Sequence, residues 1–346
     1  MACLPFLFAL SFAEMEALMT LTRRNLIAMT LAAAALPAGA MAKARTPIPV
    51  ILYTDIGGDV DDTWALLTLL RHPQLDLKLV VTETGNALYR CRLTAKLLAL
   101  AGRDDVPVAG TGDKGDGTGP QSAWVGDFSA DTYRGGVSFD GVTAMIDAVH
   151  SSPEPVTIIA LGPVTALADA LRRTPAMAKN ARFLGMEGSV RIGYGGAPKP
   201  EVEYNVKTDP AALATVFAAG WTCTITPLDT CGLMVLDGAD MQAIVASSDP
   251  FARACIANSQ AWLPNAPWMP KDFDLTKKSS TLFDVVAVMM ALDESDLVME
   301  TLRLSVRPDG MTVIDPAGRK VRVATAWKNL PRFKSKVVAA LTAKPA

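Results

Sequence analysis

Short apolar runs rich in β-branched residues alternate with longer stretches of helical pattern along most of the chain. The first pair is PVILYTD (residues 49–55), which predicts a strand, and DDTWALLTLLRH (residues 61–72), which predicts a helix. Repeated strand–helix units of this kind place parallel strands in one sheet with helices on both faces. We therefore predict an α/β fold with a single, open and mainly parallel sheet flanked by helices.

The same pattern continues to Asp229 and then changes. Further strands are predicted at residues 77–83, 106–110, 156–162, 181–187 and 223–229, and further helices at residues 89–102, 141–152, 162–175 and 209–220. Beyond Asp229 the chain is more helical, with predicted helices at 239–248 and 284–294 and a small closing β-hairpin at 298–306 and 319–327. No long linker interrupts this part, so residues 43–346 are predicted to form one domain.

Residues 1–42 have the pattern of an export signal. Arg23-Arg24 precede an apolar stretch at residues 26–36, and small residues suited to cleavage follow at positions 38, 40 and 42. The paired arginines resemble a twin-arginine signal, and Met19 is an alternative start. We expect this segment to be cleaved on export from a bacterial cytoplasm, so that the mature protein is periplasmic or secreted. An ordinary secretory signal or a retained anchor are the alternatives.

The charge of the chain indicates which partners to expect, and its cysteines indicate whether it has a zinc site or a disulfide. The 346 residues carry 33 Lys+Arg against 35 Asp+Glu, a net charge of −2, whereas nucleic acids and anionic membranes require a concentrated basic surface. We therefore expect a small-molecule substrate, no nucleic acid and no membrane after signal cleavage. Cys91, Cys223, Cys231 and Cys255 have no metal-site spacing, which argues against zinc. They are expected to be inert, with a Cys223–Cys231 disulfide as the alternative.

Four carboxylates crowd one turn, TDIGGDVDD, between the first strand and the first helix. Asp61 and Asp62 alone could be ordinary acids at a helix N-terminus, but this leaves Asp55 and Asp59 without a role. Like charges so close together repel one another, and a hard cation with oxygen ligands would relieve the repulsion. The turn therefore favours a metal site, although similar motifs also occur in phosphoryl-transfer enzymes.

Ligands of parallel α/β sheets bind beyond the carboxyl ends of the strands. Polar or sulfur-containing side chains follow several predicted strands of this chain, namely Asp55, Asn86, Thr165, Met186 and Glu187. We expect the functional site at this edge of the sheet.

The aspartate turn, TDIGGDVDDTWAL, and six further ordered blocks of sequence resemble the inosine-uridine-preferring nucleoside hydrolase family. The six blocks are TGNA, LAGRDDVPVAG, VTIIALGPVTALADAL, LGMEGSV, EYNVKTDPAA and FDVVAVM. The resemblance covers roughly residues 48 to 330 and implies a Rossmann-like nucleoside hydrolase fold, a ribonucleoside substrate and a calcium ion. It also implies a homo-oligomer, a dimer or a tetramer.

The resemblance assigns roles to individual residues. The implied calcium ligands are Asp55, Asp62, Asp284 and the backbone carbonyl of Thr165. The implied ribose contacts are Asp61, Asn86, Glu203 and Asn205, with Met186 lining the sugar pocket. Asp55 and Asp61 are the implied catalytic residues, with Asp55 taking the proton of the attacking water. Each position also has a plain structural alternative as a helix cap, a helix-start acid or a loop residue.

The sequence departs from the family in two places that bear on the chemistry. The segment between Asp55 and Asp61 is two residues longer than the usual form, which leaves Asp59 as an alternative metal ligand. Phe283 stands where many members have a histidine thought to protonate the leaving base, and only His72 and His150 occur in the chain. Ala197 also replaces a common asparagine near the sugar. The aromatic-rich stretch 262–273 is either a stacking lid or a packed loop.

We therefore expect calcium-dependent hydrolysis of the N-glycosidic bond of a ribonucleoside, giving free base and ribose. Phe283 and Ala197 lie where substrate preference would be set. The alternatives are a hydrolase of another ribosyl or sugar compound and a nucleoside- or sugar-binding protein without turnover.

Overall fold

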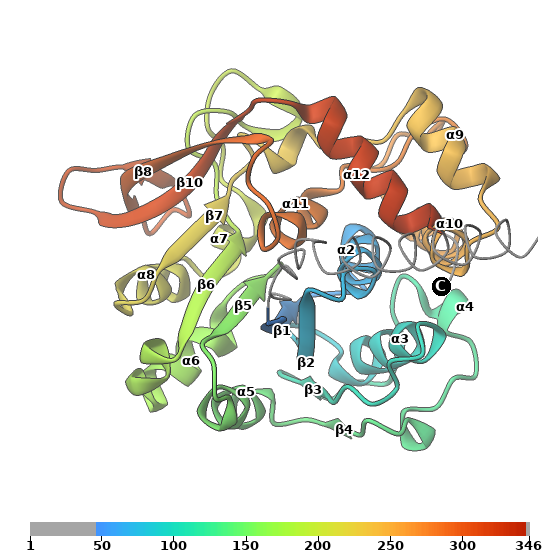
Figure 1. Ribbon diagram of the computed structural model, residues 1–346, viewed down its shortest axis with the longest axis horizontal. Coiled ribbons are helices and arrows are strands. Elements are labelled where there is room, and N and C mark those ends of the chain that lie inside the picture. The colour runs from blue at the N-terminus through green and yellow to red at the C-terminus, as the bar shows by residue number, and fades with distance from the viewer. Residues whose placement is uncertain (1–45, 344–346) are drawn as a thin grey trace, which may run out of the picture. The chain divides into compact units, whose positions relative to one another are not determined.

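A ten-stranded, mostly parallel sheet forms the centre of the computed structural model, which describes residues 46–343 (Figure 1). The strand order is β4-β3-β2-β1-β5-β6-β7-β10-β8-β9. The strands are β1 Ile48–Thr54, β2 Leu75–Thr82, β3 Val108–Gly110, β4 Val137–Ser138, β5 Val156–Ala160, β6 Ala181–Met186, β7 Cys223–Thr226, β8 Leu297–Val306, β9 Thr312–Ile314 and β10 Arg319–Trp327. The predicted α/β class and mainly parallel sheet are confirmed. The expected export signal lies outside the described residues.

Helices cover both faces of this sheet (Figure 1). Helices α5, α6 and α8 pack on one face, and α2, α3 and α9 to α12 pack on the other. Their bounds are α2 Asp61–Leu70, α3 Ala87–Leu100, α4 Ser122–Val125, α5 Gly141–Ser151, α6 Thr165–Arg173, α7 Tyr204–Thr208, α8 Pro210–Ala218, α9 Gly238–Ala246, α10 Pro250–Trp262, α11 Phe283–Met290 and α12 Leu330–Thr342. The central strand β5 is buried at every position and mostly apolar, because both of its faces are covered.

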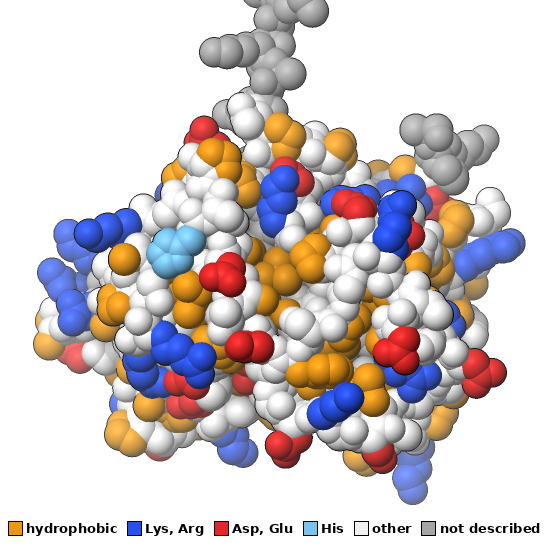
Figure 2. All heavy atoms as spheres, turned by 90° about the horizontal axis from the view of Figure 1, so that it is seen from below, with side chains coloured by type: hydrophobic (Ala, Val, Ile, Leu, Met, Phe, Trp, Pro, Cys, Tyr) orange, Lys and Arg blue, Asp and Glu red, His pale blue; other side chains and the backbone are white. Residues whose placement is uncertain are grey.

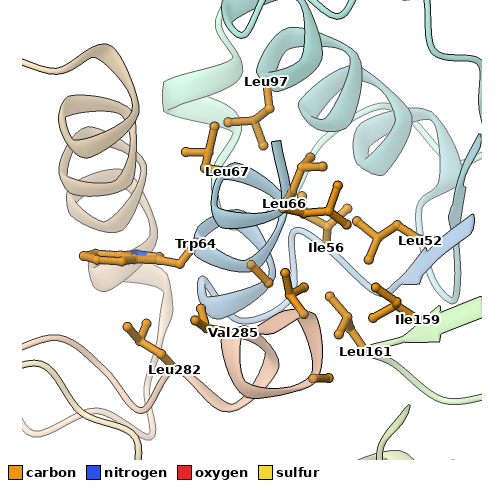
Figure 3. Packing of buried hydrophobic residues seen from close by; sticks show 14 of the residues in the cluster. Leu52, Ile56, Trp64, Leu66, Leu67, Leu97, Ile159, Leu161, Leu282 and Val285 are labelled. Carbon is orange, nitrogen blue, oxygen red and sulfur yellow. The ribbon is translucent and has the colours of Figure 1, made fainter. Parts of the chain in front are cut away.

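Helix α2 lies in the larger of the two hydrophobic cores. Its side chains Trp64 and Leu66 pack with Ile56 from the preceding loop and with Val285 of α11 (Figure 3). The indole Nε1 of Trp64 donates to the Ser259 hydroxyl of α10 at 3.1 Å. Buried apolar contacts on three sides thus fix the start of α2, which carries two of the predicted site aspartates.

The order of the strands reverses at β1. From β1 the chain proceeds to β2 on one side and later returns to β5 on the other, and both neighbours are parallel to β1. Such a switch point opens a crevice beyond the carboxyl ends of the two central strands. In this chain it lies between Asp55, directly after β1, and Leu161, directly after β5.

The C-terminal part differs in detail from the prediction. Strands β8 and β10 pair antiparallel as the predicted hairpin, but β10 also pairs in parallel with β7, so the hairpin extends the main sheet.

The four described cysteines are buried and free, so no disulfide joins Cys223 to Cys231.

Acidic and basic side chains are interspersed on the face of the molecule shown in Figure 2, with hydrophobic side chains between them. Within residues 46–343, no helix combines the length and the apolar character needed to cross a bilayer.

Candidate active site

A cavity of about 470 Å³ opens at the carboxyl edge of the sheet, at the switch point. Its size is within the usual range for small-molecule sites. Nine of its lining residues belong to the predicted site, namely Asp55, Asp59, Asp61, Asp62, Met186, Glu203, Asn205, Phe283 and Asp284. The remaining lining residues are Gly58, Arg90, Leu161, Tyr194, Tyr204, Trp268, Met269, Ser280 and Thr281.

Three buried carboxylates converge on the floor of this cavity. Asp61 and Asp62 begin α2, Asp284 lies in the first turn of α11, and each contributes an oxygen within 4.8 Å of the others. Both helices direct their N-termini toward the cluster, which favours negative charge there. The Thr54 hydroxyl at the end of β1 donates to Asp62 and orients its carboxylate.

Asp55 and Asp59 lie in the preceding loop, residues 55–60, which we call the aspartate loop. Asp59 accepts a hydrogen bond from the amide of Val60 at 2.6 Å. Among the described residues, the Asp55 carboxylate has no hydrogen-bond donor. It lies so close to Gly162 that a Cβ on this glycine would stand 2.7 Å from its Oδ1. Packing against Gly162, rather than a hydrogen bond, therefore positions the Asp55 carboxylate.

The cavity is a poor environment for negative charge without a cation. Burial raises the pKa of Asp61, Asp62 and Asp284 well above the ordinary aspartate value, and repulsion from neighbouring carboxylates, including Asp55 and Asp59, raises it further. Burial also raises the pKa of Asp55, where Arg90 partly offsets the effect, and raises that of Asp59 to about 6.

Two residues of α3 and one from α4's N-terminus hold the aspartate loop in place. Arg90 donates to the Ile56 carbonyl at 2.7 Å and to the Thr84 carbonyl at 2.8 Å. The Tyr89 hydroxyl donates to the Gly57 carbonyl at 3.2 Å, and the Gln121 side chain donates to the Asp59 carbonyl at 2.9 Å. Gly57 has φ +99°, which glycine adopts readily. These contacts fix a loop that lacks regular structure.

The wall nearest β6 is built around Glu203 and Asn205. Glu203 caps α7 by accepting the amides of Asn205 and Val206, and it also accepts the amide of Gly188 at 3.0 Å. Burial raises the pKa of Glu203 to about 7. The Asn205 amide donates to the carbonyls of Leu161 and Met186, each at 2.9 Å. These contacts join the ends of β5, β6 and α7 along one wall of the cavity.

Aromatic side chains form the outer part of the cavity. Phe283 lies next to Asp284, and its ring meets the ring of Tyr194 edge-on at 6.0 Å. Tyr204 and Trp268 also line the cavity and are 58 % and 59 % exposed. The stretch 262–273 is therefore divided: Trp262 is buried in the core, whereas Trp268 stands at the cavity.

Two predicted site residues lie outside this lining. The Thr165 hydroxyl donates to Asp209 at 3.0 Å, and Leu161, four positions earlier, is the residue at the cavity after β5. Asn86 caps α3 and donates to the Asp116 carboxylate at 2.6 Å. Both side chains therefore make contacts away from the cavity, whereas the expected metal ligand at Thr165 is its backbone carbonyl and the expected role of Asn86 is a ribose contact.

The sequence was compared with protein families and with known proteins. Residues 50–336 match the family described as inosine-uridine preferring nucleoside hydrolase. The chain belongs to this family. It is 31 % identical over 224 residues to the pyrimidine-specific ribonucleoside hydrolase RihA of Enterobacter sp. (strain 638), covering 59 % of this chain and 67 % of that protein. The equivalent protein of Shewanella sp. (strain ANA-3) is also 31 % identical, over 227 residues, which are 60 % of this chain and 67 % of that one.

Solved structures of nucleoside hydrolases share the fold. The plant nucleoside hydrolase PpNRh1 superposes with a TM-score of 0.73 at 23 % identity, covering 86 % of this chain and 100 % of that one. The purine-preferring ribonucleoside hydrolase from Gardnerella vaginalis gives 0.65 at 23 % identity, with 85 % and 98 % coverage. As a nucleoside hydrolase family member, the protein is an N-glycosyl hydrolase that acts on ribonucleosides.

Sequence reasoning on this nucleoside hydrolase missed several lining residues. Arg90 has a helical pattern around it that gives no sign of a function, and Leu161 is an apolar residue whose carbonyl, which accepts from Asn205, leaves no mark in the sequence. Tyr194 follows a glycine in a polar segment and precedes Gly195 at φ +60°, a turn signal that could have marked an exposed aromatic residue.

Proposed function

We propose that this protein is a calcium-dependent hydrolase of ribonucleosides that releases the free base and ribose. The observation that carries the proposal is the convergence of three buried carboxylates, within 4.8 Å, in a cavity that also holds Glu203 and Asn205. The donor set consists of oxygens alone, which suits calcium or magnesium and does not suit zinc. Calcium fits better because carboxylates from two helices and a loop form an irregular set of ligands.

The residues that would hold the ion are Asp62 and Asp284, with Asp55 and the Leu161 carbonyl completing the set. Leu161 replaces Thr165 in this role because it is the residue at the cavity after β5. Its carbonyl accepts one hydrogen bond, from Asn205, and retains a second lone pair. Bound calcium would orient the ribose hydroxyls and lower the pKa of the attacking water.

The chain's own groups then divide the reaction between them. Asp55 takes the proton of the attacking water, since its carboxylate has no donor among the described residues and faces the cavity. Asp61, Glu203 and Asn205 hold the ribose hydroxyls. Cleavage of the N-glycosidic bond develops positive charge on the ribose ring, and the carboxylates around it stabilise this charge in a cavity with little water.

The base would occupy the aromatic outer part of the cavity. Phe283 and Trp268 present ring faces or edges that stack on a nucleobase without selecting its hydrogen-bonding groups. The similar proteins include pyrimidine-specific and purine-preferring enzymes, and stacking suits either kind of base.

A panel of ribonucleosides with reducing-sugar detection tests this function. We expect turnover of at least one nucleoside, loss of turnover after chelation, and recovery on adding calcium. Asp62→Asn should lower kcat/KM by at least about 10³-fold, because it removes an oriented charge at the reacting centre. Asp240→Asn is the matched control, since Asp240 also lies in the first turn of a helix, α9, away from the cavity. Full activity of Asp62→Asn would refute the proposal, as would a purified protein that binds no calcium by elemental analysis.

We also propose that the protein is exported from the cytoplasm and that it forms a homo-oligomer. The arginine pair and the apolar stretch that follows it support export by a twin-arginine route to the periplasm or outside the cell. The family resemblance supports a homo-oligomer. Fractionation of cells expressing Arg23→Lys/Arg24→Lys tests export, and light scattering of the purified protein tests assembly.

A further inference from the structure

Departure of the base is easier when a side chain donates a hydrogen bond to it, and no histidine lines the cavity to do so. Cleavage of the C1′–N bond leaves its electron pair on the base, and a donor at the base lowers this barrier. Neither histidine lines the cavity: His72 follows the end of α2, and His150 lies in the last turn of α5. The donor must therefore come from another side chain of the outer cavity.

Tyr194 has the contacts expected of such a donor. Its hydroxyl accepts the backbone amide of Tyr204 at 2.9 Å, which fixes the position of the oxygen. A phenol that accepts one hydrogen bond keeps its own proton for donation, and no acceptor for this proton exists among the described residues. The hydroxyl is thus held in place by the protein and has its proton free for a ligand.

The position of Tyr194 is on the side of the cavity where the base would lie. Its ring packs against the edge of Phe283, the neighbour of Asp284. If the ribose is held by the acids on the floor and by Glu203, the base extends outward past Phe283. Tyr194 is 40 % exposed, whereas Asp61, Asp62 and Asp284 are buried, so the tyrosine is farther out than the acids.

We propose that the hydroxyl of Tyr194 donates a hydrogen bond to the departing base during N-glycosidic cleavage, an inference that rests on the proposed function. The C1′–N bond breaks, its electron pair passes to the base nitrogen, and hydroxide from the attacking water bonds to C1′. The proton of that water passes to Asp55 and finally, through solvent, to the released base. Tyr194 keeps its proton throughout and stabilises the charge that develops on the base.

The electrostatics of the site agree with donation without proton transfer. Burial and the nearby Glu203 carboxylate raise the pKa of Tyr194 above its ordinary value. The phenol is therefore protonated at every pH at which the enzyme would act. A phenol is also a stronger hydrogen-bond donor than the aliphatic hydroxyl of Ser280, another donor of the cavity lining, which is buried and has no partner within the described chain.

The experiment compares two substrates that differ only in the leaving group. Nucleosides release a poor leaving group and need the donor, whereas p-nitrophenyl β-D-ribofuranoside releases a stable phenolate and does not. We expect Tyr194→Phe to lower kcat/KM for the nucleoside by about 10²-fold and for the nitrophenyl riboside by less than about 3-fold. Tyr133→Phe, which removes a hydroxyl far from the cavity, should leave both rates unchanged. Circular dichroism and thermal unfolding of each variant check that it is folded.

Other results of this experiment would contradict either the role of Tyr194 or the proposed function. Equal losses on both substrates would place Tyr194 at the ribose and overturn the inference, as would equal retention of both rates. A nucleoside-specific loss in Ser280→Ala, with none in Tyr194→Phe, would assign the donor to Ser280 instead. If the wild-type protein hydrolyses the nitrophenyl riboside but no nucleoside, the proposed function fails, and this inference fails with it.

Discussion

Glu83 and Glu187 are both buried near the cavity, but only Glu83 has hydrogen-bond partners for its carboxylate. Glu83 follows β2 and accepts hydrogen bonds from the hydroxyls of Tyr53 and Thr111. Glu187 follows β6, is fully buried, and has no partner for either carboxylate oxygen in the described structure. Its side chain lies next to Gly185 and is not part of the cavity lining. Burial raises the pKa of Glu187 well above its ordinary value, and repulsion from Glu203 adds to this.

Replacing Glu187 by methionine should stabilise the protein by about 1–3 kcal/mol at neutral pH, because the variant buries no unpartnered polar group. The pKa of Glu187 is raised in the folded state, so above the ordinary glutamate pKa the folded protein binds more protons than the unfolded chain. Its contribution to stability is therefore lost as the pH rises, and the advantage of the variant should grow from pH 5 to pH 8. Urea unfolding of both proteins, with calcium present, measures the difference.

Glu83→Met is the matched control for this prediction. It leaves the Tyr53 hydroxyl without its acceptor and Thr111 with the Thr82 carbonyl alone, and it should destabilise the protein by about 1–3 kcal/mol, the opposite sign. A destabilised Glu187→Met variant would show that the carboxyl has a partner, such as a buried water.

At the scale of elements, α3 holds the aspartate loop in place through the side chains of Tyr89 and Arg90. Arg90 connects the aspartate loop to the turn after β2, where Thr84 has φ 62°, the one positive φ outside glycine in the described chain. Both segments are irregular and would otherwise be held by few contacts. The two extra residues of the aspartate loop are thus compensated by hydrogen bonds from a helix packed behind it.

Arg90→Gln should weaken calcium binding by about 10-fold to 100-fold, the range typical of residues that orient metal ligands. Arg90→Lys should recover only part of this affinity, because an ammonium group cannot reproduce the fork of guanidinium donors. Calorimetric titration with calcium measures the dissociation constants. Arg92→Gln is the control: Arg92 lies on the same helix and binds three carbonyls, but those of Gly117, Gly126 and Phe128. Equal losses of affinity in the two variants would contradict a specific role of Arg90.

The sequence predicted elements better than it predicted contacts. The helix predicted from residue 61 begins at Asp61, because acids in the first turn and apolar periodicity both mark it. Helices α10 and α12 escaped prediction although both begin with a capping residue and an early proline, Asp249-Pro250 and Asn329 with Pro331. These signals are local and could have been used.

Long-range contacts of the candidate site residues are harder to predict from the sequence. The partners of Asn86 are Asp116 and Thr118, some thirty positions ahead in a glycine-rich loop, and no local pattern shows such a contact. A backbone carbonyl leaves no mark in the sequence, since any residue can supply it. The choice between Thr165 and Leu161 therefore depends on where β5 ends, which the structure gives and the sequence pattern does not.

At the scale of the whole molecule, the acidic floor of the cavity leads us to expect that stability depends on pH and on the proposed metal. Burial raises the pKa of Asp61, Asp62 and Asp284, so the metal-free folded protein binds more protons than the unfolded chain above the ordinary aspartate pKa. The stability of the metal-free protein should therefore fall as the pH rises from 5 to 8. Asp59, with a pKa raised to about 6, titrates within this window.

Calcium should reverse this trend, since it binds the deprotonated carboxylates and only the folded state assembles the site. We expect the chelated protein to have a lower Tm at pH 8 than at pH 5, and saturating calcium to raise the Tm more at pH 8 than at pH 5. In Asp284→Asn both the pH dependence and the calcium effect should be reduced, because one of the three converging charges is removed. Differential scanning calorimetry at both pH values, with chelator and with calcium, measures all four temperatures. A calcium-induced rise that is equal at both pH values would show that the ion binds away from these aspartates.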